Sequence, residues 1–288
     1  MRRTSVKIAH NGPRAVRFAQ LTICLLAGTA GAGILLAQAP PAAGGPTQVK
    51  KTSGNQFGPK SKGEAEAVNE VIQSQAKSPD DIIKAVDNLT GKYADTVYKS
   101  FALELAAEAY QQKGDNAKSI VYAEQALAAD PKNFEADNLL ANVTAATTRD
   151  TDLDKEEKLT KADKYAHDAL DVLENGGKPQ LYANATDEQW DKRKKQSEAL
   201  SWQALGTVAL TRKKNDEAIA DFEKGVALNP DPVLLIRTGR AQIAAKKYDD
   251  AIANFEKVMN DAAAPAQIKS IAQADRVRAV QAKGPSTK

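Results

Sequence analysis

Few side chains of this sequence could take part in catalysis or bind a metal. Its only cysteine, Cys24, and one of its two histidines lie in the first 43 residues. The other histidine, His167, lies in the helical pattern DKYAHDALDVL. A catalytic or zinc-binding histidine needs an orienting partner and a nucleophile or further ligands, and no other His or Cys is left to provide them. We therefore expect His167 on the surface and predict no catalytic, metal-binding or cofactor-binding residues.

The charged clusters have structural explanations as well. Asp80-Asp81 and Asp249-Asp250 stand at predicted helix starts, where negative charge is favourable next to the helix dipole. No GxxxxGK[ST] or GxGxxG motif is present to bind phosphate groups. The one basic run, KRKK at residues 192–195, is flanked by acids on the same predicted helix. This favours a solvated helix face, and contact with lipid headgroups is the alternative.

Residues 1–43 have the pattern of a targeting segment. Five bases and no acid occur among them, and an apolar run extends from Leu21 to Ala37. This order is typical of a signal peptide or an N-terminal anchor. A cut after Ala39 would fit a signal peptide, but Pro40 follows and should hinder it, so a cleaved and a retained segment both stay open. In either case we predict an exported protein, periplasmic or anchored in the inner membrane with its body outside the cytoplasm.

The rest of the chain is almost neutral. Without the five early bases, 35 of the 40 Lys and Arg remain against 37 Asp and Glu, a net charge of −2. Nucleic-acid binding needs clustered Lys and Arg, so this balance argues against a nucleic-acid partner. We expect membrane contact only through residues 1–43, if they are retained. Gly, Pro, Ser and Lys dominate residues 44–63, which predicts a flexible linker, and residues 284–288 are predicted to be a disordered tail.

From Glu64 to Lys283 the pattern is helical. Ala, Leu, Lys, Glu, Asp and Gln dominate and aromatic residues make up only 5% of the sequence, which favours helix over strand. Turn and helix-stop signals divide this stretch into helices of roughly 10–17 residues. These signals lie at residues 77–79, 113–115, 130–131, 175–177, 213–215, 229–232 and 246–248.

The C-terminal half of the sequence repeats itself with a period of 33 residues. Three residue types recur at this spacing: Gly206 with Gly239, Ala218 with Ala251, and Phe222 with Phe255. We expect the small residues where the two helices of a pair touch, because a larger side chain would push them apart. The phenylalanines should fill the space within the pair. Pro230 should end the second helix, since proline cannot continue the hydrogen-bond ladder.

This repeat resembles the tetratricopeptide pattern W-x2-L-G-x2-Y…A-x3-F…P. In the first copy the pattern is filled by Trp202, Leu205, Gly206, Ala218, Phe222 and Pro230, with Ala209 in place of the aromatic residue. The resemblance implies an all-α fold, a right-handed α-solenoid of antiparallel helix pairs with about four to five repeats and a C-terminal capping helix. The expected repeats within residues 64–283 are 64–99, 100–133, 134–175, 186–231 and 232–264, followed by a cap at 266–282. The order of these pieces is similar to that of exported bacterial members of the family.

The resemblance also implies where a protein partner would bind. In this family the first helix of each pair lines a concave groove, and the residues after the Trp and Gly positions point into it. Here those residues are Glu104, Glu108, Asn138, Asn142, Gln203, Thr207, Ile236 and Arg240. The alternative is that they are merely the polar exposed face of any helix. Family members that grip a terminal carboxylate use Lys and Asn at such positions, and no matching Lys is present here.

The implied function is binding rather than a reaction. We predict a non-enzymatic protein–protein interaction scaffold in the cell envelope that binds its partner through the concave face. The alternative is a membrane-anchored structural tether or spacer of an envelope complex. One aromatic residue stays ambiguous at this point, because Trp190 fits either the core of the segment inserted before residue 199 or an exposed anchor.

Overall fold

Eleven α-helices and one short 3₁₀ helix account for most of residues 58–284, the part of the chain that the computed structural model describes. No strand occurs among these residues. The predicted targeting segment, residues 44–57 of the predicted linker and residues 285–288 lie outside the described part. The helices are α1 (Lys62–Ser74), α2 (Pro79–Lys92), α3 (Lys99–Gln112), α4 (Asn116–Ala129), α5 (Phe134–Thr147), α6 (Lys155–Asn175), η1 (Gln180–Tyr182), α7 (Asp187–Thr211), α8 (Asn215–Leu228), α9 (Pro232–Ala244), α10 (Tyr248–Asn260) and α11 (Ala266–Lys283).

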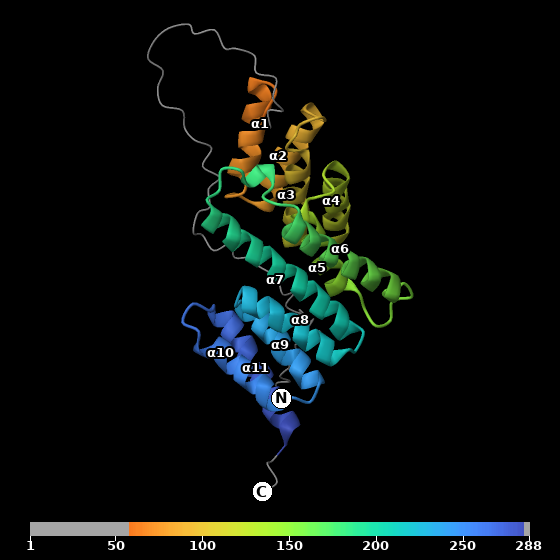
Figure 1. Cartoon of the computed structure of the whole chain (residues 1–288), viewed down its shortest axis with the longest axis vertical. Coiled ribbons are helices and arrows are strands. Elements are labelled where there is room, and N and C mark those ends of the chain that lie inside the picture. The colour runs from red at the N-terminus through yellow and green to blue at the C-terminus, as the bar shows by residue number, and fades with distance from the viewer. Residues whose placement is uncertain (1–57, 285–288) are drawn as a thin grey trace, which may run out of the picture. The chain divides into compact units, whose positions relative to one another are not determined.

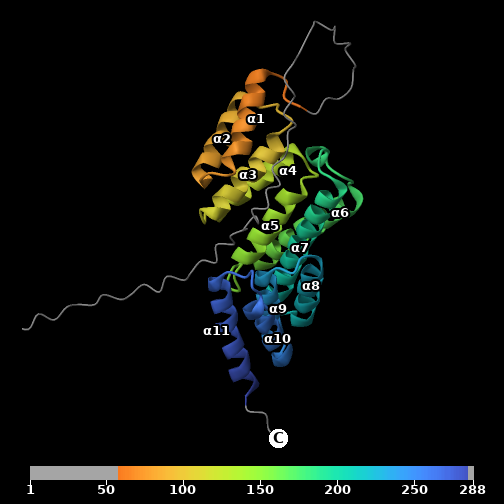
Figure 2. The ribbon, with the colours of Figure 1, turned by 90° about the vertical axis from the view of Figure 1, so that its left-hand side faces the viewer.

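The α-helices follow one another as packed antiparallel pairs (Figure 1). Five pairs run from α1 with α2 to α9 with α10. The second helix of each pair contacts the first helix of the next, and α5 also contacts α3 and α7. The last helix, α11, packs against α10 and α9 (Figure 2). The predicted all-α solenoid of helix pairs is confirmed.

Side chains cap the starts of α2 and α7. At α2, Ser78 accepts a hydrogen bond from the Asp81 backbone N–H, and the Asp81 carboxylate accepts one from the Ser78 N–H. Pro79 takes the first helical position, where no N–H is needed. Thr186 and Gln189 form the same capping box at the start of α7. These bonds satisfy backbone donors that have no partner inside the helix, so the starts are encoded locally.

The residues of the repeat signature lie mainly in the contact between the two helices of a pair. The rings of Phe222 and Phe255 are almost fully buried. A methyl group at Gly206 would lie 2.5 Å from the Phe222 ring, and one at Gly239 would lie 2.6 Å from the Phe255 ring. Only glycine leaves room for a phenylalanine at this distance. Of the other signature residues, Leu205, Ala218 and Ala251 are buried, Trp202 is half-buried and Pro230 is exposed.

The turn between paired helices has the same backbone in three repeats. Gly114, Lys213 and Lys246 occupy equivalent turns and have φ angles of 77°, 63° and 62°. In each turn the next residue's N–H donates to the carbonyl five residues earlier, which closes the end of the first helix. The left-handed conformation costs an ordinary L-residue roughly 1–2 kcal/mol, so the two lysine turns are strained where the glycine turn is not.

Candidate partner-binding surface

The predicted groove residues lie on α3, α5, α7 and α9, and α5 packs directly against both α3 and α7. Four of the eight are buried, so their expected place on an open groove is wrong: Glu104, Asn138, Gln203 and Ile236. The other four are half-buried or exposed: Glu108, Asn142, Thr207 and Arg240. Whether any of the eight contacts a partner stays a prediction. Their environments differ, and three regions account for most of them.

The first region is a ladder of amide hydrogen bonds that joins α5 to α7. Asn138 Nδ2 donates to the Ser197 carbonyl at 3.0 Å, and Asn138 Oδ1 accepts from the Ser201 hydroxyl at 2.7 Å. One turn later, Asn142 Nδ2 donates to a backbone carbonyl of α7 at 3.0 Å. Gln203 Nε2 completes the ladder by donating to Asn142 Oδ1 at 2.8 Å. Buried side-chain amides need hydrogen-bond partners. These amides find them across the interface between two repeats, so they are not left free to bind a partner protein.

The second region lies where α3, α5 and the start of α7 meet, and there Glu135 binds the guanidinium of Arg193 while Glu104 and Glu108 lie near enough to feel its charge. Glu104 and Glu108 lie one turn apart on α3, with Glu104 buried and Glu108 half-buried. Glu135 of α5 accepts from Arg193 Nε of α7 at 2.9 Å and also from the Tyr182 hydroxyl. The Glu135 side chain is 11% exposed, whereas the Arg193 side chain is 40% exposed. Two predicted groove residues thus share a site with three residues that were not predicted.

Burial and repulsion oppose full ionisation of this cluster. Burial raises the pKa of Glu104 well above its ordinary value, and the charges of Glu108 and Glu135 raise it further while Arg193 lowers it. Burial likewise raises the pKa of Glu108. The pKa of Arg193 is raised, chiefly by Glu135, so this guanidinium stays charged. The cluster therefore has more acidic groups than its one base neutralises, and it holds a proton under conditions that ionise an exposed carboxyl.

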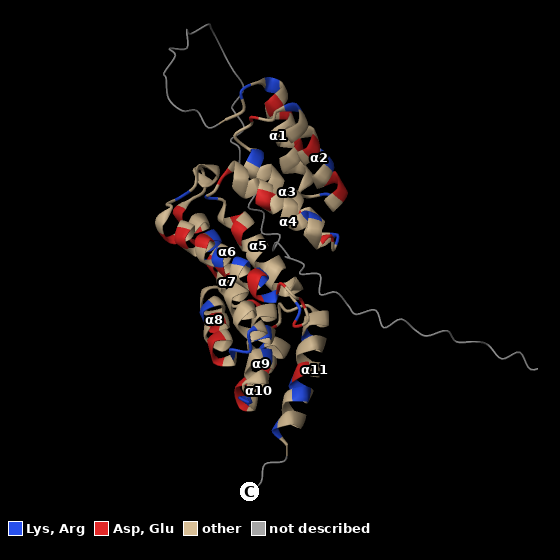
Figure 3. Cartoon of the chain, turned by 90° about the vertical axis from the view of Figure 1, so that its right-hand side faces the viewer, with Lys and Arg blue, Asp and Glu red and all other residues tan. Residues whose placement is uncertain are grey.

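Arg193 belongs to the basic run at residues 192–195, for which we expected a solvated face. For Arg193 that expectation is wrong, whereas the three lysines of the run are exposed or paired with acids on α7 itself. Charges of both signs are mixed in this way over α6, α7 and α8 (Figure 3). Arg193 lies three residues after Trp190 and four before the buried Ser197, on the stripe of α7 that faces α5. The spacing of four residues from the buried Ser197 would have placed Arg193 on this face of the helix from the sequence.

Trp190 belongs to an aromatic cluster beneath the inserted segment. Its ring centroid lies 5.3 Å from that of Tyr182 and 6.1 Å from that of Phe134 at the start of α5. The Phe134 and Tyr182 rings are stacked at 6.3 Å. Trp190 is therefore part of the core of the inserted segment, which decides between the two alternatives. This packing holds Tyr182 and Arg193 against Glu135.

The third region is the end of the array, where α11 covers predicted groove positions of α9. Ile236 packs in the hydrophobic cluster shared by α9, α10 and α11. Arg240 Nε donates to the buried Asp275 carboxylate at 2.6 Å, and Arg278 donates to the same carboxylate at 2.7 Å. Arg240 thus attaches the capping helix. Beside it, the buried Nε of Arg237 has no hydrogen-bond partner among the described residues.

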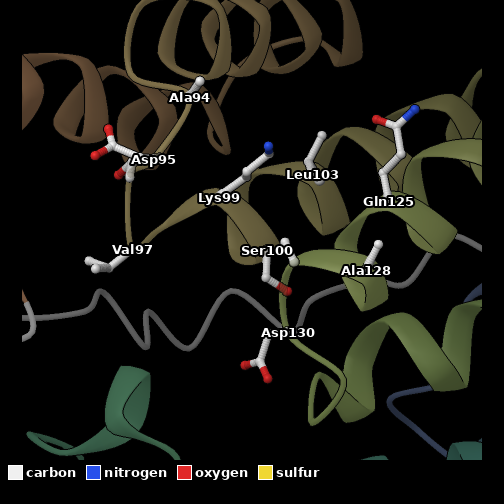
Figure 4. A pocket seen from close by; sticks show the side chains of 11 residues that line it. Ala94, Asp95, Val97, Lys99, Ser100, Leu103, Gln125, Ala128 and Asp130 are labelled. Atoms are coloured by element: carbon white, nitrogen blue, oxygen red, sulfur yellow. The ribbon is translucent and has the colours of Figure 1, made fainter.

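A cavity of about 470 Å³ lies beside α3, at the turn of residues 94–97 and the end of α4 (Figure 4). Its charged lining has both signs, from Asp95, Asp130 and Lys99, and Leu103 provides apolar surface. None of the predicted groove residues lines this cavity.

His167 is exposed, as predicted, and its Nδ1 lies 2.9 Å from the Asp163 carbonyl oxygen. Between residues 58 and 284, no three His, Cys, Asp or Glu side chains are arranged to hold a metal ion. Over the same range, none of the helices combines the length and the apolar character needed to span a bilayer.

Known proteins are similar to this chain in the repeats and in the fold. The tetratricopeptide repeat family model matches residues 102–133 and 199–232. The crystal structure of TTC0263, a thermophilic TPR protein of Thermus thermophilus, is similar with a TM-score of 0.56 and 16% sequence identity, over 74% of this chain and 99% of that one. The assembly chaperone of RpL4 (Acl4) has a TM-score of 0.40 and 12% identity over 75% of this chain and 96% of its own, too weak a likeness to carry an argument. No curated protein sequence matches. At this level of identity the first likeness shows a shared fold alone.

Proposed function

Because this chain is a tetratricopeptide-repeat protein, we propose that it is a non-enzymatic scaffold that binds a protein partner in the cell envelope. Repeats of this type indicate protein–protein interaction. The observation that carries the proposal is that the signature residues and the charged residues of the first helices have different roles. Signature residues such as Gly206 and Phe222 are buried in the contact between paired helices. Charged side chains elsewhere on the first helices of the pairs, including Glu108 and Arg193, keep part of their surface open.

A cross-linked pull-down tests the binding. The purified protein is incubated with envelope extract, cross-linked and recovered, with its Phe222→Ala variant as the control. The variant keeps the surface charges but loses the packing of its repeat, so a partner that recognises the folded repeats from α7 to α11 should be recovered with the unchanged protein only. A set of captured proteins that is the same for both would contradict binding by these repeats.

The envelope location rests on the five bases and the apolar run within residues 1–43. Residues 1–62 fused to a reporter that is active only outside the cytoplasm should give a signal. A silent reporter, with the native protein in the cytosol, would contradict export. If export holds, the mass of the purified protein separates a cleaved scaffold from a tether that keeps its N-terminal anchor.

A further inference from the structure

Arg237 is a cation without a partner in the last repeat. It lies in the middle of α9, and its side chain is half-buried. Its Nε is buried without a hydrogen-bond partner, and the guanidinium forms no hydrogen bond or ion pair with any of the described residues. Its two Nη atoms are likewise unpaired, but they are not buried. A guanidinium has five donors and keeps its charge, so leaving it unpaired away from water is unfavourable.

The acids on this side of the array are bound elsewhere. The Asp231 carboxylate, whose charge acts on Arg237, caps the start of α9 by accepting from two backbone N–H groups at 2.6 and 3.1 Å. The buried Asp275 carboxylate accepts from Arg240 and Arg278. Burial lowers the pKa of Arg237, and so does the charge of Arg240 one turn later. The end of the array therefore carries positive charge that its own acids do not neutralise.

The stripe of α9 that carries Arg237 is open to solvent. Val233 and Arg240, one turn before and one turn after Arg237, are half-buried and exposed, and Ala244 at the end of the same stripe is exposed. The neighbouring stripe is different, because Leu234 is buried against α7 and α8. A ligand can thus reach the Nη atoms of Arg237 between an apolar residue and a second arginine.

We propose that Arg237 binds the side chain of an aspartate or glutamate of the partner protein on this open stripe, beside Arg240. This inference rests on the proposed scaffold function and names the chemistry of its ligand. A carboxylate suits a single free guanidinium because its one negative charge matches and its two oxygens can accept two parallel hydrogen bonds. The terminal carboxylate of a partner suits this chain less well. The amide side chains at the positions that family members use for it, Asn138 and Asn142, are bound to α7.

Arg237 could instead serve packing alone, with its aliphatic stem covering apolar surface. Arg237→Gln separates the two roles, because glutamine keeps part of the stem and two donors but carries no charge. If the side chain only packs, this variant changes the melting temperature and leaves ligand binding as it was. If Arg237 is a binding residue, the variant loses ligand binding and keeps its fold, since the guanidinium has no partner in the free protein to lose.

The probe is a capped five-residue peptide with one central glutamate, compared with the same peptide containing glutamine. Titration into the purified protein, followed by the NMR signals of the arginine side-chain N–H groups, should show saturable binding of the glutamate peptide, with the Arg237 signal among those that shift. The glutamine peptide should bind at least tenfold more weakly. Arg237→Gln should weaken the glutamate peptide at least tenfold, about 1.4 kcal/mol. Arg149→Gln, the same charge change on an exposed residue in the turn after α5, should leave it unchanged.

Equal binding of the two peptides, or a glutamate-peptide affinity that Arg237→Gln leaves unchanged, overturns the site. A glutamine peptide with a free C-terminus that binds as tightly as the glutamate peptide overturns the choice of a side-chain carboxylate. An unchanged melting temperature of Arg237→Gln excludes unfolding as the cause of lost binding. If that temperature falls, the Arg237 signal of the unchanged protein decides, because a signal that the glutamate peptide does not shift also overturns the site.

The envelope pull-down is independent of this outcome. A partner captured equally well by Arg237→Gln and by the unchanged protein would remove Arg237 from the binding surface and leave the scaffold function standing.

Discussion

Replacing Phe222 with alanine should destabilise the repeat that it joins. The ring is 1% exposed and packs between α7 and α8 with Ala209, Ala218 and Ile219, and Leu234 of α9 closes the cluster. Removing a buried phenylalanine ring costs about 3–5 kcal/mol, from lost burial and from the cavity left behind. The upper part of this range applies if the helices stay apart, and the lower part applies if they close over the cavity.

A second substitution, Gly206→Ala, tests the contact between Gly206 and the Phe222 ring directly. In Gly206→Ala the added methyl group meets the Phe222 ring at 2.5 Å, and overpacking of this kind costs roughly 1–3 kcal/mol. In the Phe222→Ala background the ring is gone, so the same change should cost less than about 0.5 kcal/mol. Gly91 provides the matched control, because it lies within α2 with no atom in reach of an added methyl group. Gly91→Ala should not destabilise the protein, since no atom clashes with the added methyl group and alanine is the better helix former.

Urea unfolding gives the free energies, and hydrogen exchange shows where protection is lost. Because each repeat contacts only its neighbours, Phe222→Ala should lower protection mainly in α7 to α11 and leave α1 and α2 close to normal. Two results would refute the reasoning. One is an equal cost of Gly206→Ala with and without the ring, and the other is a uniform loss of protection from residue 62 to residue 283.

Two further predictions concern pH and backbone strain. Burial and the neighbouring Asp168 raise the pKa of Asp137 to about 7 from an ordinary value of 3.8. The folded protein therefore keeps a proton that the unfolded chain releases, so this carboxyl lowers stability as the pH rises from about 4 to 7, and the loss stays constant above pH 7. Asp137→Asn should raise the free energy of unfolding at pH 8 by up to about 4 kcal/mol and change it little at pH 4, measured by urea unfolding at both values; a gain that does not depend on pH would contradict this. Lys213→Gly and Lys246→Gly should each stabilise the protein by up to about 1 kcal/mol, because glycine adopts the left-handed turn without strain, and a lower melting temperature of both variants would contradict the turn analysis.

The local features were predicted because each one is encoded within a few residues. Turn signals at 113–115, 213–215 and 246–248 coincide with the turns that end α3, α7 and α9. The start of α7 follows Thr186, whose capping partner is three residues away. The Gly and Phe of the signature recur every 33 residues because each repeat makes the same contact between its two helices. The packing within one repeat can therefore be recognised from residue types alone, because the contact between the two helices requires a small side chain opposite a large one.

The candidate site was predicted only in part, because its composition depends on contacts between distant segments. Glu104 and Glu108 were found from the repeat position, but Arg193 reaches Glu135 across 58 residues of sequence and Asn138 reaches Ser197 across 59. Asp275 holds Arg240 across 35 residues, so a residue expected to face a partner attaches α11 instead.

The sequence by itself determined the helices, their pairing, the 33-residue period and the residues that hold each pair together, because these follow from side-chain size, helix caps and turns within one repeat. Only the tertiary structure decided which polar side chains of the first helices stay open and which carboxyls are buried. The start of α7 packs across α5, and α11 packs against α9, and neither placement is part of the repeat. The physical reason is that burial and Coulomb interactions depend on distances in space, so the charge balance of Glu104, Glu108, Glu135 and Arg193 exists only once the helices have assembled.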